Sequence, residues 1–292
     1  MVSVITITYN RAHLIGEAIR SVLSQSYSDF EYLIMDDGSE DDTESVVRSF
    51  NDSRIIYRRI DHSGKIAFLR NQAMKLARGE FIAFVDSDDL WMNEKLQQQL
   101  DAIKNDSSDF SFCEAEIFTS KKIVFPFLYD KHDLPSTGNY FLPLISDVKF
   151  VLFPSTVLFK TACLSKTGYL NEEHESGDKE FLCHLTLTFK GSFVNKKLVR
   201  IRRHEENVTH DFEHVKGILE DELKTTHHFY SKGAIDKRLY RKLSARFQYK
   251  LAEHLFHAGR FSQATNHYST SLKLNPLNWK AIAKIIISLS KS

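Results

Sequence analysis

The sequence lacks a glycine-rich phosphate-binding loop. Its 292 residues include eleven glycines, and no two of them have the spacing of a G-x-G-x-x-G or Walker motif. A Rossmann-type dehydrogenase and a P-loop kinase are therefore disfavoured. If a diphosphate binds to this chain, a metal ion and basic side chains such as Lys65, Arg70 or His204 must offset its charge.

Cysteines and long apolar runs are also scarce. The three cysteines, Cys113, Cys163 and Cys183, are odd in number and lack the spacing of metal ligands, so we expect reduced, buried thiols in a cytoplasmic protein. No apolar run approaches the roughly 20 residues that span a bilayer. A strand pattern begins at Val2, which predicts that no signal peptide is present.

Acidic and basic residues are unevenly distributed, although the net charge is only +1. Residues 1–210 hold 25 Lys and Arg against 31 Asp and Glu, whereas residues 211–292 hold 14 against 7. The 42% of hydrophobic residues is ordinary for a globular protein. We therefore predict an acidic domain over 1–210 and a basic, mostly helical extension over 211–292.

The first hundred residues alternate between strand and helix patterns. We predict four strands, at residues 2–8, 32–36, 55–59 and 81–85, and four helices, at residues 12–25, 42–50, 65–78 and 93–105. Successive strand–helix units imply an α/β fold with a mostly parallel, Rossmann-like sheet and helices on both faces. Ligands of such sheets bind beyond the carboxyl ends of the strands.

Residues 110–175 predict an antiparallel addition that completes this sheet. The expected elements of the second half of the domain are short strands at 110–112, 116–118, 123–125 and 154–160, a helix at 179–189 and a last strand at 198–202.

The richest acidic cluster, Asp86-Ser87-Asp88-Asp89, follows the apolar run 81–85 directly. Neighbouring carboxylates repel one another unless a cation lies among them, so this strand end predicts a metal site. Mg²⁺ or Mn²⁺ prefers such oxygen ligands and keeps positions open for phosphate oxygens. Both Asp86 and Asp88 could approach one ion, or one could bind the metal and the other a ribose.

Three further motifs each have two interpretations. Asp36-Asp37-Gly38-Ser39 is either a turn before a helix or a contact for a base or ribose. Asp178, in the acidic stretch 172–180, either caps the following helix or acts as a general base. His204 lies either at a basic surface or on a metal or diphosphate.

These motifs, in this order, resemble glycosyltransferase family 2, whose members have the GT-A fold. The similar segments are Val2 through Arg11, Ser21 through Tyr27, Asp36-Asp37-Gly38-Ser39, Ala67 through Asn71, Gly79-Glu80-Phe81-Ile82 and Asp86-Ser87-Asp88-Asp89. The resemblance covers roughly residues 1–210 and implies a nucleotide-binding half at 1–105 and an acceptor half at 106–210.

The resemblance implies a role for each matching residue. Nucleotide-sugar contacts would come from Thr8, Tyr9 and Arg11 of the first loop, Asp37 on the pyrimidine, Lys65 and Arg70, Asp86 on the ribose, Ser87, and His204 on the diphosphate. Asp88 of this D-x-D motif would hold Mn²⁺ or Mg²⁺, together with Asp86 and His204. Asp178 would be the catalytic base of a direct displacement, which inverts the anomeric carbon.

The implied activity is metal-dependent transfer from a nucleotide-sugar, most simply a UDP-sugar, to a hydroxyl group of a glycan or lipid-linked acceptor. Such a reaction belongs to the synthesis of surface polysaccharides or glycoconjugates. Two departures stand out. Gly177 replaces the glutamate that many members have before the base, and neither Trp91 nor Trp279 lies in the Gln-x-x-Arg-Trp motif of processive synthases.

Two other functions remain open from the residues. A nucleotidyltransferase would need a glycine-rich basic loop after the first strand, and Thr8-Tyr9-Asn10-Arg11 is not one. A catalytically weak nucleotide-sugar-binding scaffold, acting through its basic helical tail, would not need Asp86, Asp88 and Asp178 together.

The tail from Lys224 onward contains 13 Lys and Arg against two acids, Asp236 and Glu253. Its residues 252–276 resemble one tetratricopeptide-like helical pair, which would pack on the body or on a second subunit of a homodimer. The basic face is either solvated or docks the enzyme on anionic lipids at the inner face of the membrane. Nucleic acid is disfavoured, because the body is acidic and aromatic residues do not alternate with basic ones.

Overall fold

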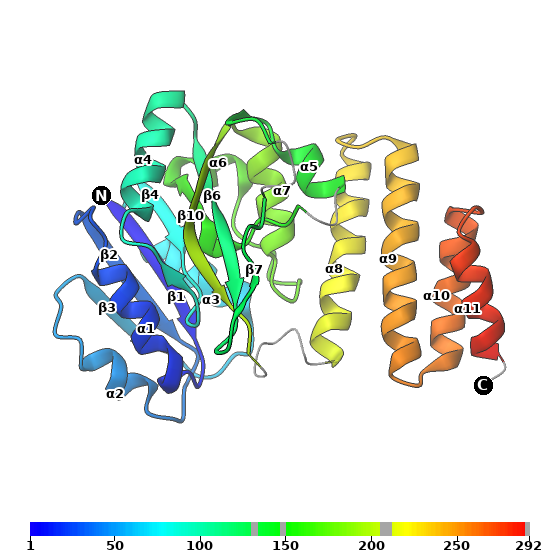
Figure 1. The fold of residues 1–292 in the computed structure, drawn as a ribbon, viewed down its shortest axis with the longest axis horizontal. Coiled ribbons are helices and arrows are strands. Elements are labelled where there is room, and N and C mark those ends of the chain that lie inside the picture. The colour runs from blue at the N-terminus through cyan, green and yellow to red at the C-terminus, as the bar shows by residue number, and fades with distance from the viewer. Residues whose placement is uncertain (130–133, 147–149, 205–211, 290–292) are drawn as a thin grey trace. The chain divides into compact units, whose positions relative to one another are not determined.

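The computed structural model describes residues 1–129, 134–146, 150–204 and 212–289. The chain forms two compact units (Figure 1). The first, the sheet unit, contains Met1–Glu172 and Ser176–His204, and the second, the helical unit, contains Glu173–Glu175 with Glu205–Ser292. The predicted boundary between residues 210 and 211 lies outside the described residues.

A ten-stranded sheet, in the order β3-β2-β1-β4-β9-β6-β10-β5 with β7 beside β6 and β8 beside β10, forms the centre of the sheet unit. The strands are β1 Val2–Thr8, β2 Phe30–Asp36, β3 Ile55–Arg59, β4 Phe81–Phe84, β5 Leu90–Trp91, β6 Phe110–Phe118, β7 Ile123–Phe125, β8 Thr137–Gly138, β9 Val157–Lys160 and β10 Gly191–Arg202. Strands β3, β2, β1 and β4 are parallel, as their apolar runs predict.

Helices cover both faces of this sheet (Figure 1). Those of the sheet unit are α1 Ala12–Leu23, α2 Thr43–Arg48, α3 Ile66–Leu76, α4 Lys95–Asp106, α5 Phe141–Ser146, α6 Leu164–Thr167 and α7 Asp178–Thr188. Alternate residues of β1 serve the two faces, because side chains alternate along a strand. Val2 and Val4 belong to the buried cluster that contains Ile15 and Ile19 of α1, and α3 packs against β1 and β2.

The second half of the sheet differs from its prediction. Residues 110–118 form one continuous strand rather than two, because the intervening Glu114 is buried with its hydrogen bonds satisfied. Its carboxylate accepts backbone N–H groups of Leu128 and Tyr129, at 2.6 and 2.8 Å. Strand β10 is parallel to β6, whereas β9 is antiparallel to both β4 and β6, so the addition is mixed rather than purely antiparallel.

The helical unit contains α8 Phe212–Ser231, α9 Lys237–His257, α10 Phe261–Leu274 and α11 Trp279–Leu289. Each helix packs against the next in sequence. The buried cluster of this unit includes Ala252 and Leu255 of α9 with Ala264 and Tyr268 of α10, the small and apolar positions of the predicted helical pair. Among the described residues, no helix combines the length and the apolar character needed to cross a bilayer.

Candidate active site

The acidic cluster forms a tight turn at the carboxyl end of β4. The N–H of Asp89 donates to the carbonyl of Asp86 at 3.1 Å, and the N–H of Asp86 donates to the hydroxyl of buried Ser155 at 3.1 Å. Asp89 accepts the backbone N–H of Arg202 at 3.0 Å. Burial, and then the charges of Asp88 and Asp86, raise the pKa of Asp89 well above its usual value. Asp89 therefore holds the turn to β10.

Arg70 of α3 joins two carboxylates that are distant in sequence. Its guanidinium donates to Asp86 Oδ1 at 2.8 Å and, through its other terminal nitrogen, to Asp178 Oδ1. The Arg70 side chain is only 5% exposed and lies over the ring of Phe84, 5.3 Å from its centroid. Because an arginine fork fixes the direction of both hydrogen bonds, Arg70 sets the position of Asp178 relative to the strand end.

The charges in this cluster affect one another. Burial opposes the charge of Arg70, but Asp178 and Asp86 outweigh that effect and raise the pKa of the guanidinium. Burial also raises the pKa of Asp86; Arg70 opposes the shift, while Asp88 and Asp178 add to it. The buried guanidinium of Arg70 thus offsets the negative charges of both Asp86 and Asp178.

Asp88 and His204 are 116 positions apart in the sequence but in contact in the structure. His204 Nε2 lies 2.9 Å from Asp88 Oδ2, and Arg202 Nε donates to the carbonyl of Asp88 at 3.0 Å. Carboxylate oxygens suit Mn²⁺ or Mg²⁺. Burial raises the pKa of Asp86, and among the smaller causes the negative charges of Asp88 and Asp178 add to the shift, so a cation nearby would offset part of it. Asp88 and His204 therefore offer two neighbouring ligand atoms to a divalent metal, whereas Asp86 Oδ1 is bonded to Arg70.

The first loop after β1 is fastened by the loop after β2. The N–H of Asn10 donates to the hydroxyl of Ser39 at 2.9 Å, and the N–H of Arg11 donates to that of Thr43 at 3.0 Å. Thr8 ends β1, and its buried hydroxyl has no hydrogen-bond partner among the described residues. A buried hydroxyl without a hydrogen bond lowers the stability of the folded state, unless a ligand supplies the missing hydrogen bond.

Asp37 is held by the turn that precedes α3. Its carboxylate accepts the N–H groups of Ser63 and Gly64, both at 2.8 Å. The ring of His62 stacks on that of Tyr9, with centroids 4.1 Å apart, and its Nδ1 lies 2.9 Å from Asp37 Oδ2. Asp37, predicted to contact the base, and Tyr9, predicted to contact the nucleotide-sugar, thus both adjoin His62.

Two other predicted residues have contrasting positions. Ser87 is buried between Asp86 and Asp88, whereas Lys65 is exposed immediately before α3.

Gly38 of the Asp36-Asp37-Gly38-Ser39 motif has φ +78°, and a Cβ there would lie 2.8 Å from the backbone nitrogen of His62. The turn after β2 therefore requires glycine at this position.

Asp178 is the first residue of α7, directly after Gly177 in the left-handed conformation. Gly177 has φ +70°, and a Cβ there would lie 3.0 Å from the carbonyl oxygen of Asn171. Asn71 of α3 holds the segment that contains Asn171 in place. Its amide donates to the carbonyl of Leu170 at 2.9 Å and to Glu172 at 2.7 Å. The same helix, α3, thus positions both the loop and, through Arg70, the carboxylate.

A buried polar network behind the acidic turn is absent from the predictions. Lys95 Nζ donates to Gln99 Oε1 at 2.6 Å and lies 3.9 Å from the centroid of Trp91. Gln99 donates to the carbonyl of Thr156 at 2.9 Å, and Trp91 Nε1 to that of Ser155 at 3.0 Å. The only signal in the sequence is the helical spacing of Trp91, Lys95 and Gln99, which resembles an exposed polar face.

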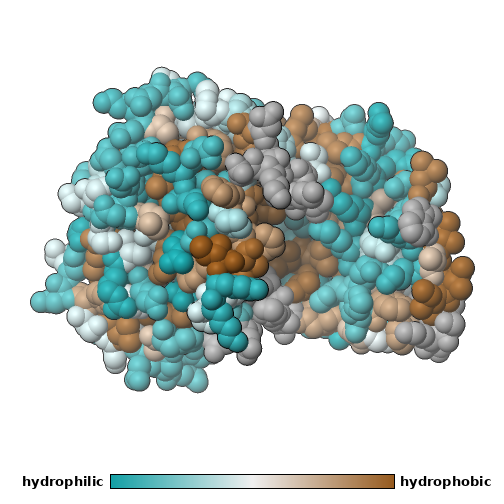
Figure 2. All heavy atoms as spheres, viewed as in Figure 1, coloured by the Kyte–Doolittle hydropathy of each residue, from teal (hydrophilic) through white to brown (hydrophobic). Residues whose placement is uncertain are grey.

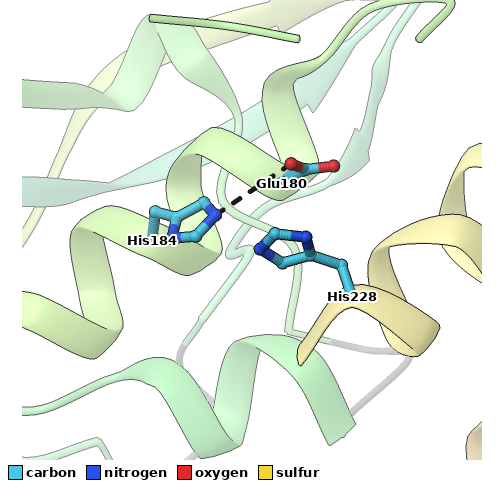
Figure 3. A group of neighbouring side chains, drawn as sticks. All are labelled: Glu180, His184 and His228. Carbon is cyan, nitrogen blue, oxygen red and sulfur yellow. Dashed lines mark ion pairs between the residues drawn. The ribbon is translucent and has the colours of Figure 1, made fainter. Parts of the chain in front are cut away.

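The end of the acidic stretch 172–180 lies on α7. Glu180 and His184 are one turn apart, with His184 Nε2 4.0 Å from Glu180 Oε1 (Figure 3). The third side chain in Figure 3, His228, comes from α8 of the helical unit. The Glu180–His184 pair is a contact between residues four positions apart on one helix.

Comparison of the sequence with known proteins identifies relatives. The sequence model described as Glycosyl transferase family 2 matches residues 3–142. Two Escherichia coli relatives are both named UDP-Glc:alpha-D-GlcNAc-diphosphoundecaprenol beta-1,3-glucosyltransferase. WfaP is 31% identical over 192 residues, covering 65% of this chain and 71% of WfaP. WfgD is 40% identical over 128 residues, covering 44% of this chain and 51% of WfgD, so the match spans about half of WfgD.

Solved structures resemble the chain over nearly its whole length. The S. aureus TarS 1-349 structure has a TM-score of 0.69 at 23% identity, covering 98% of this chain and 88% of that one. The mannosyltransferase PcManGT from Pyrobaculum calidifontis, in complex with GDP-Man and Mn²⁺, has a TM-score of 0.57 at 16% identity, covering 99% and 79%. At these identities the likeness concerns the fold, and it confirms the predicted GT-A fold with C-terminal helices.

Proposed function

The chain belongs to glycosyltransferase family 2, and on that premise we propose that it transfers a sugar from a UDP-sugar to an acceptor hydroxyl group, with inversion at the anomeric carbon. The names of the relatives support a UDP-sugar donor and an acceptor linked to a lipid diphosphate. A TarS structure that resembles the chain, with a TM-score of 0.60, contains UDP-GlcNAc, which is compatible with this donor class. The product would be part of a polysaccharide or glycoconjugate.

The observation that carries the proposal is the bridge from Arg70 to Asp86 and Asp178. A displacement needs a base at the acceptor and a donor site beside it. Asp86 belongs to the predicted donor site and Asp178 is the predicted base, and a single buried guanidinium bonds both. The guanidinium thereby holds these two carboxylates beside each other, which supports the assignment of the two roles.

The donor would bind across the carboxyl ends of β1, β2 and β4. Tyr9, beside Asp37, offers a ring for the base, and the unsatisfied hydroxyl of Thr8 offers a hydrogen bond. Asp86 would accept a ribose hydroxyl beside buried Ser87. Arg11 in the first loop, exposed Lys65 and His204 are the basic side chains available near the phosphates in this scheme.

Asp88, with Asp86 and His204, would hold Mn²⁺ or Mg²⁺. When bound, the metal would supply positive charge against the negative charge that develops on the departing UDP. The fit rests on the Asp88–His204 contact and on the crowded carboxylates.

Asp178 would take the proton of the acceptor hydroxyl as that oxygen attacks the anomeric carbon. The bond from the anomeric carbon to the UDP oxygen breaks in the same step, so the configuration inverts. Arg70 would orient the carboxylate of Asp178 for this transfer. A second carboxylate nucleophile is not required by this scheme.

The test is Asp178→Asn, which keeps the size of the side chain and removes its basicity. We expect binding of UDP-glucose with Mn²⁺, measured by calorimetry, to change by less than about threefold. Transfer to a GlcNAc-diphospho-lipid acceptor should fall by about 10²–10⁴, the range of general base catalysis. NMR of the product's anomeric proton reports the inversion.

A matched control is Asp109→Asn, which also removes a carboxylate from the sheet unit, in this case one paired with Lys160 at 3.1 Å. It should leave transfer unchanged. Full transfer by Asp178→Asn would refute the assignment of the base, and a retained anomeric configuration would refute the direct displacement.

A further inference from the structure

The helical unit has a basic hollow that the proposed reaction does not use. It lies between the start of α9 and the connection from α10 to α11, with a volume of about 710 Å³. Its lining includes four cations, Lys237, Arg238, Arg241 and Lys242, together with Leu274 and Leu277. All four basic residues are exposed. The hollow therefore combines positive charge with apolar walls.

The positive charge of the hollow is not neutralised within the described part of the chain. None of its four cations forms an ion pair there, and helical spacing places Lys237 next to Arg241 and Arg238 next to Lys242. Arg241 donates to the carbonyl of Leu274 at 3.3 Å, which ties α9 to the end of α10. Such a concentration of like charge on one helix start is unfavourable unless anions approach it.

Exposed apolar residues lie at the rim of the hollow and along α11. Leu277, at the rim, is 88% exposed, and Ile282, Ile286 and Ile287 are 45%, 66% and 43% exposed. The opposite face of α11 packs inward through buried Ala281. Hydrophobic atoms gather over α11 in Figure 2.

We propose that the hollow and the outer face of α11 together bind the surface of a membrane that contains anionic phospholipids. Phosphate headgroups would meet the cations of the hollow, while Leu277 and the exposed isoleucines would enter the boundary between headgroups and acyl chains. Neither feature alone specifies a membrane, because a basic patch also attracts nucleic acid and an apolar patch also attracts protein. Leu277 lines the hollow and lies two residues before α11, and the presence of both features in this part of the chain favours a surface that is both anionic and apolar.

Membrane binding through this surface is separate from sugar transfer and does not depend on it. Where the proposed function holds, the surface would keep the enzyme beside an acceptor that is itself anchored in the membrane. The charge balance of the tail from Lys224 onward, 13 Lys and Arg against two acids, has the same sign as the hollow.

The experiment is flotation of the full chain with vesicles. With vesicles of phosphatidylglycerol and phosphatidylcholine in equal parts, at 50 mM NaCl, we expect the protein to float with the lipid. With pure phosphatidylcholine it should stay behind, and 500 mM NaCl should weaken binding because salt screens exposed charges.

Two variants test the two features separately. Arg238→Glu with Lys242→Glu should lower the partition coefficient by at least about tenfold, because each basic residue near an anionic surface contributes about 1 kcal/mol. The control Lys121→Glu with Lys122→Glu makes the same charge change at exposed lysines of the sheet unit and should leave binding unchanged. Ile286→Ser should lower it by about threefold or more through lost apolar contact, whereas Leu142→Ser, 55% exposed on α5, should not.

Failure of the wild type to float at low salt would overturn the proposal, as would equal binding by both paired variants. Retention of a single-stranded RNA instead of vesicles would assign the hollow to nucleic acid. A dimer in light scattering that Ile286→Ser dissociates would assign α11 to a second copy. The variants should still hydrolyse UDP-glucose slowly with Mn²⁺ as the wild type does, so loss of vesicle binding and loss of the proposed chemistry are measured independently.

Discussion

The two units of this chain use charged residues in opposite ways. In the sheet unit, the charges at the strand ends are bonded to named partners: Arg70 serves Asp86 and Asp178, and His204 contacts Asp88. In the helical unit, the cations at the start of α9 are exposed and have no ion-pair partner among the described residues. The first arrangement fixes geometry, and the second presents charge to the solvent.

The difference agrees with what the two proposed ligands would require. A reacting sugar must be held within fractions of an ångström, so its contacts are preorganised by rigid neighbours. A membrane surface has no fixed geometry, and exposed lysine and arginine side chains can adapt to it while their charge acts at longer range. Changes to the buried charged residues at the strand ends of the sheet unit should therefore have large effects on stability, and changes to the exposed cations of the helical unit small ones.

The largest effect is expected for Arg70→Met. The substitution leaves Asp86 and Asp178 without their shared cation, and Asp86 next to Asp88. Breaking a buried ion pair costs about 3–5 kcal/mol, and since both carboxylates here reach solvent we expect about 2–4 kcal/mol in the free energy of unfolding. Urea denaturation measures it, and sugar transfer should be lost with it.

The matched control for Arg70 is Arg54→Met, which removes an arginine paired with Asp52 at 2.7 Å in a half-exposed position of the same unit. That change should cost less than about 1 kcal/mol and leave transfer intact. If the two substitutions lowered the free energy of unfolding equally, the bridge from Arg70 to Asp86 and Asp178 would contribute no more to stability than a partly exposed ion pair does.

A second effect of burial in the sheet unit is a dependence of stability on pH. Lys95 is fully buried, and burial lowers its pKa from 10.5 to about 8. Below about pH 8 both the folded and the unfolded chain hold the proton, so the cost of burying the ammonium group is fully present. Between about pH 8 and 10.5 only the unfolded chain holds it, so the folded state gains stability as the pH rises.

Lys95→Met isolates this contribution. The free energy of unfolding of the wild type, relative to that of the variant, should rise by roughly 3 kcal/mol from pH 7.5 to pH 10.5. Tyrosine and cysteine titrations occur in both proteins and largely cancel in the difference. Lys104→Met, at an exposed position of the same helix, should give a flat difference, and a flat difference for Lys95→Met would mean that its ammonium group is solvated.

Much of the sheet could be predicted because its strands have uninterrupted apolar runs. Strands β1 and β3 have the predicted bounds, and β4 ends one residue before the predicted end. Since parallel strands end at one edge, the same pattern also predicts that Asp37, Asp86 and Asp88 lie near one another.

The connections between distant residues could not be predicted. The partners Arg70 and Asp178 are 108 positions apart. No local sequence pattern distinguishes an arginine that bridges two carboxylates from one that binds a diphosphate. Lys95 has the sequence context of an exposed helical position, and only the packing of Trp91 and Gln99 around it makes it buried. Contacts between residues distant in sequence determine both the partners of Arg70 and the burial of Lys95, and a single sequence does not reveal such contacts.

The smallest expected effect is that of Arg238→Gln in the helical unit, and its sign is the opposite of that for Arg70. Arg238 lies in the first turn of α9, where the helix dipole disfavours a positive charge, and one turn before Lys242. Removing its charge should raise the free energy of unfolding by about 0.3–0.8 kcal/mol at low salt, with less gain at 500 mM NaCl. Arg48→Gln provides the counterpart, because Arg48 pairs with Glu44 at 2.7 Å on an exposed helix surface and its loss should lower stability by about 0.3–0.5 kcal/mol. Loss of stability in Arg238→Gln would show that the exposed cations of α9 contribute to the fold, and the contrast between the two units would then fail.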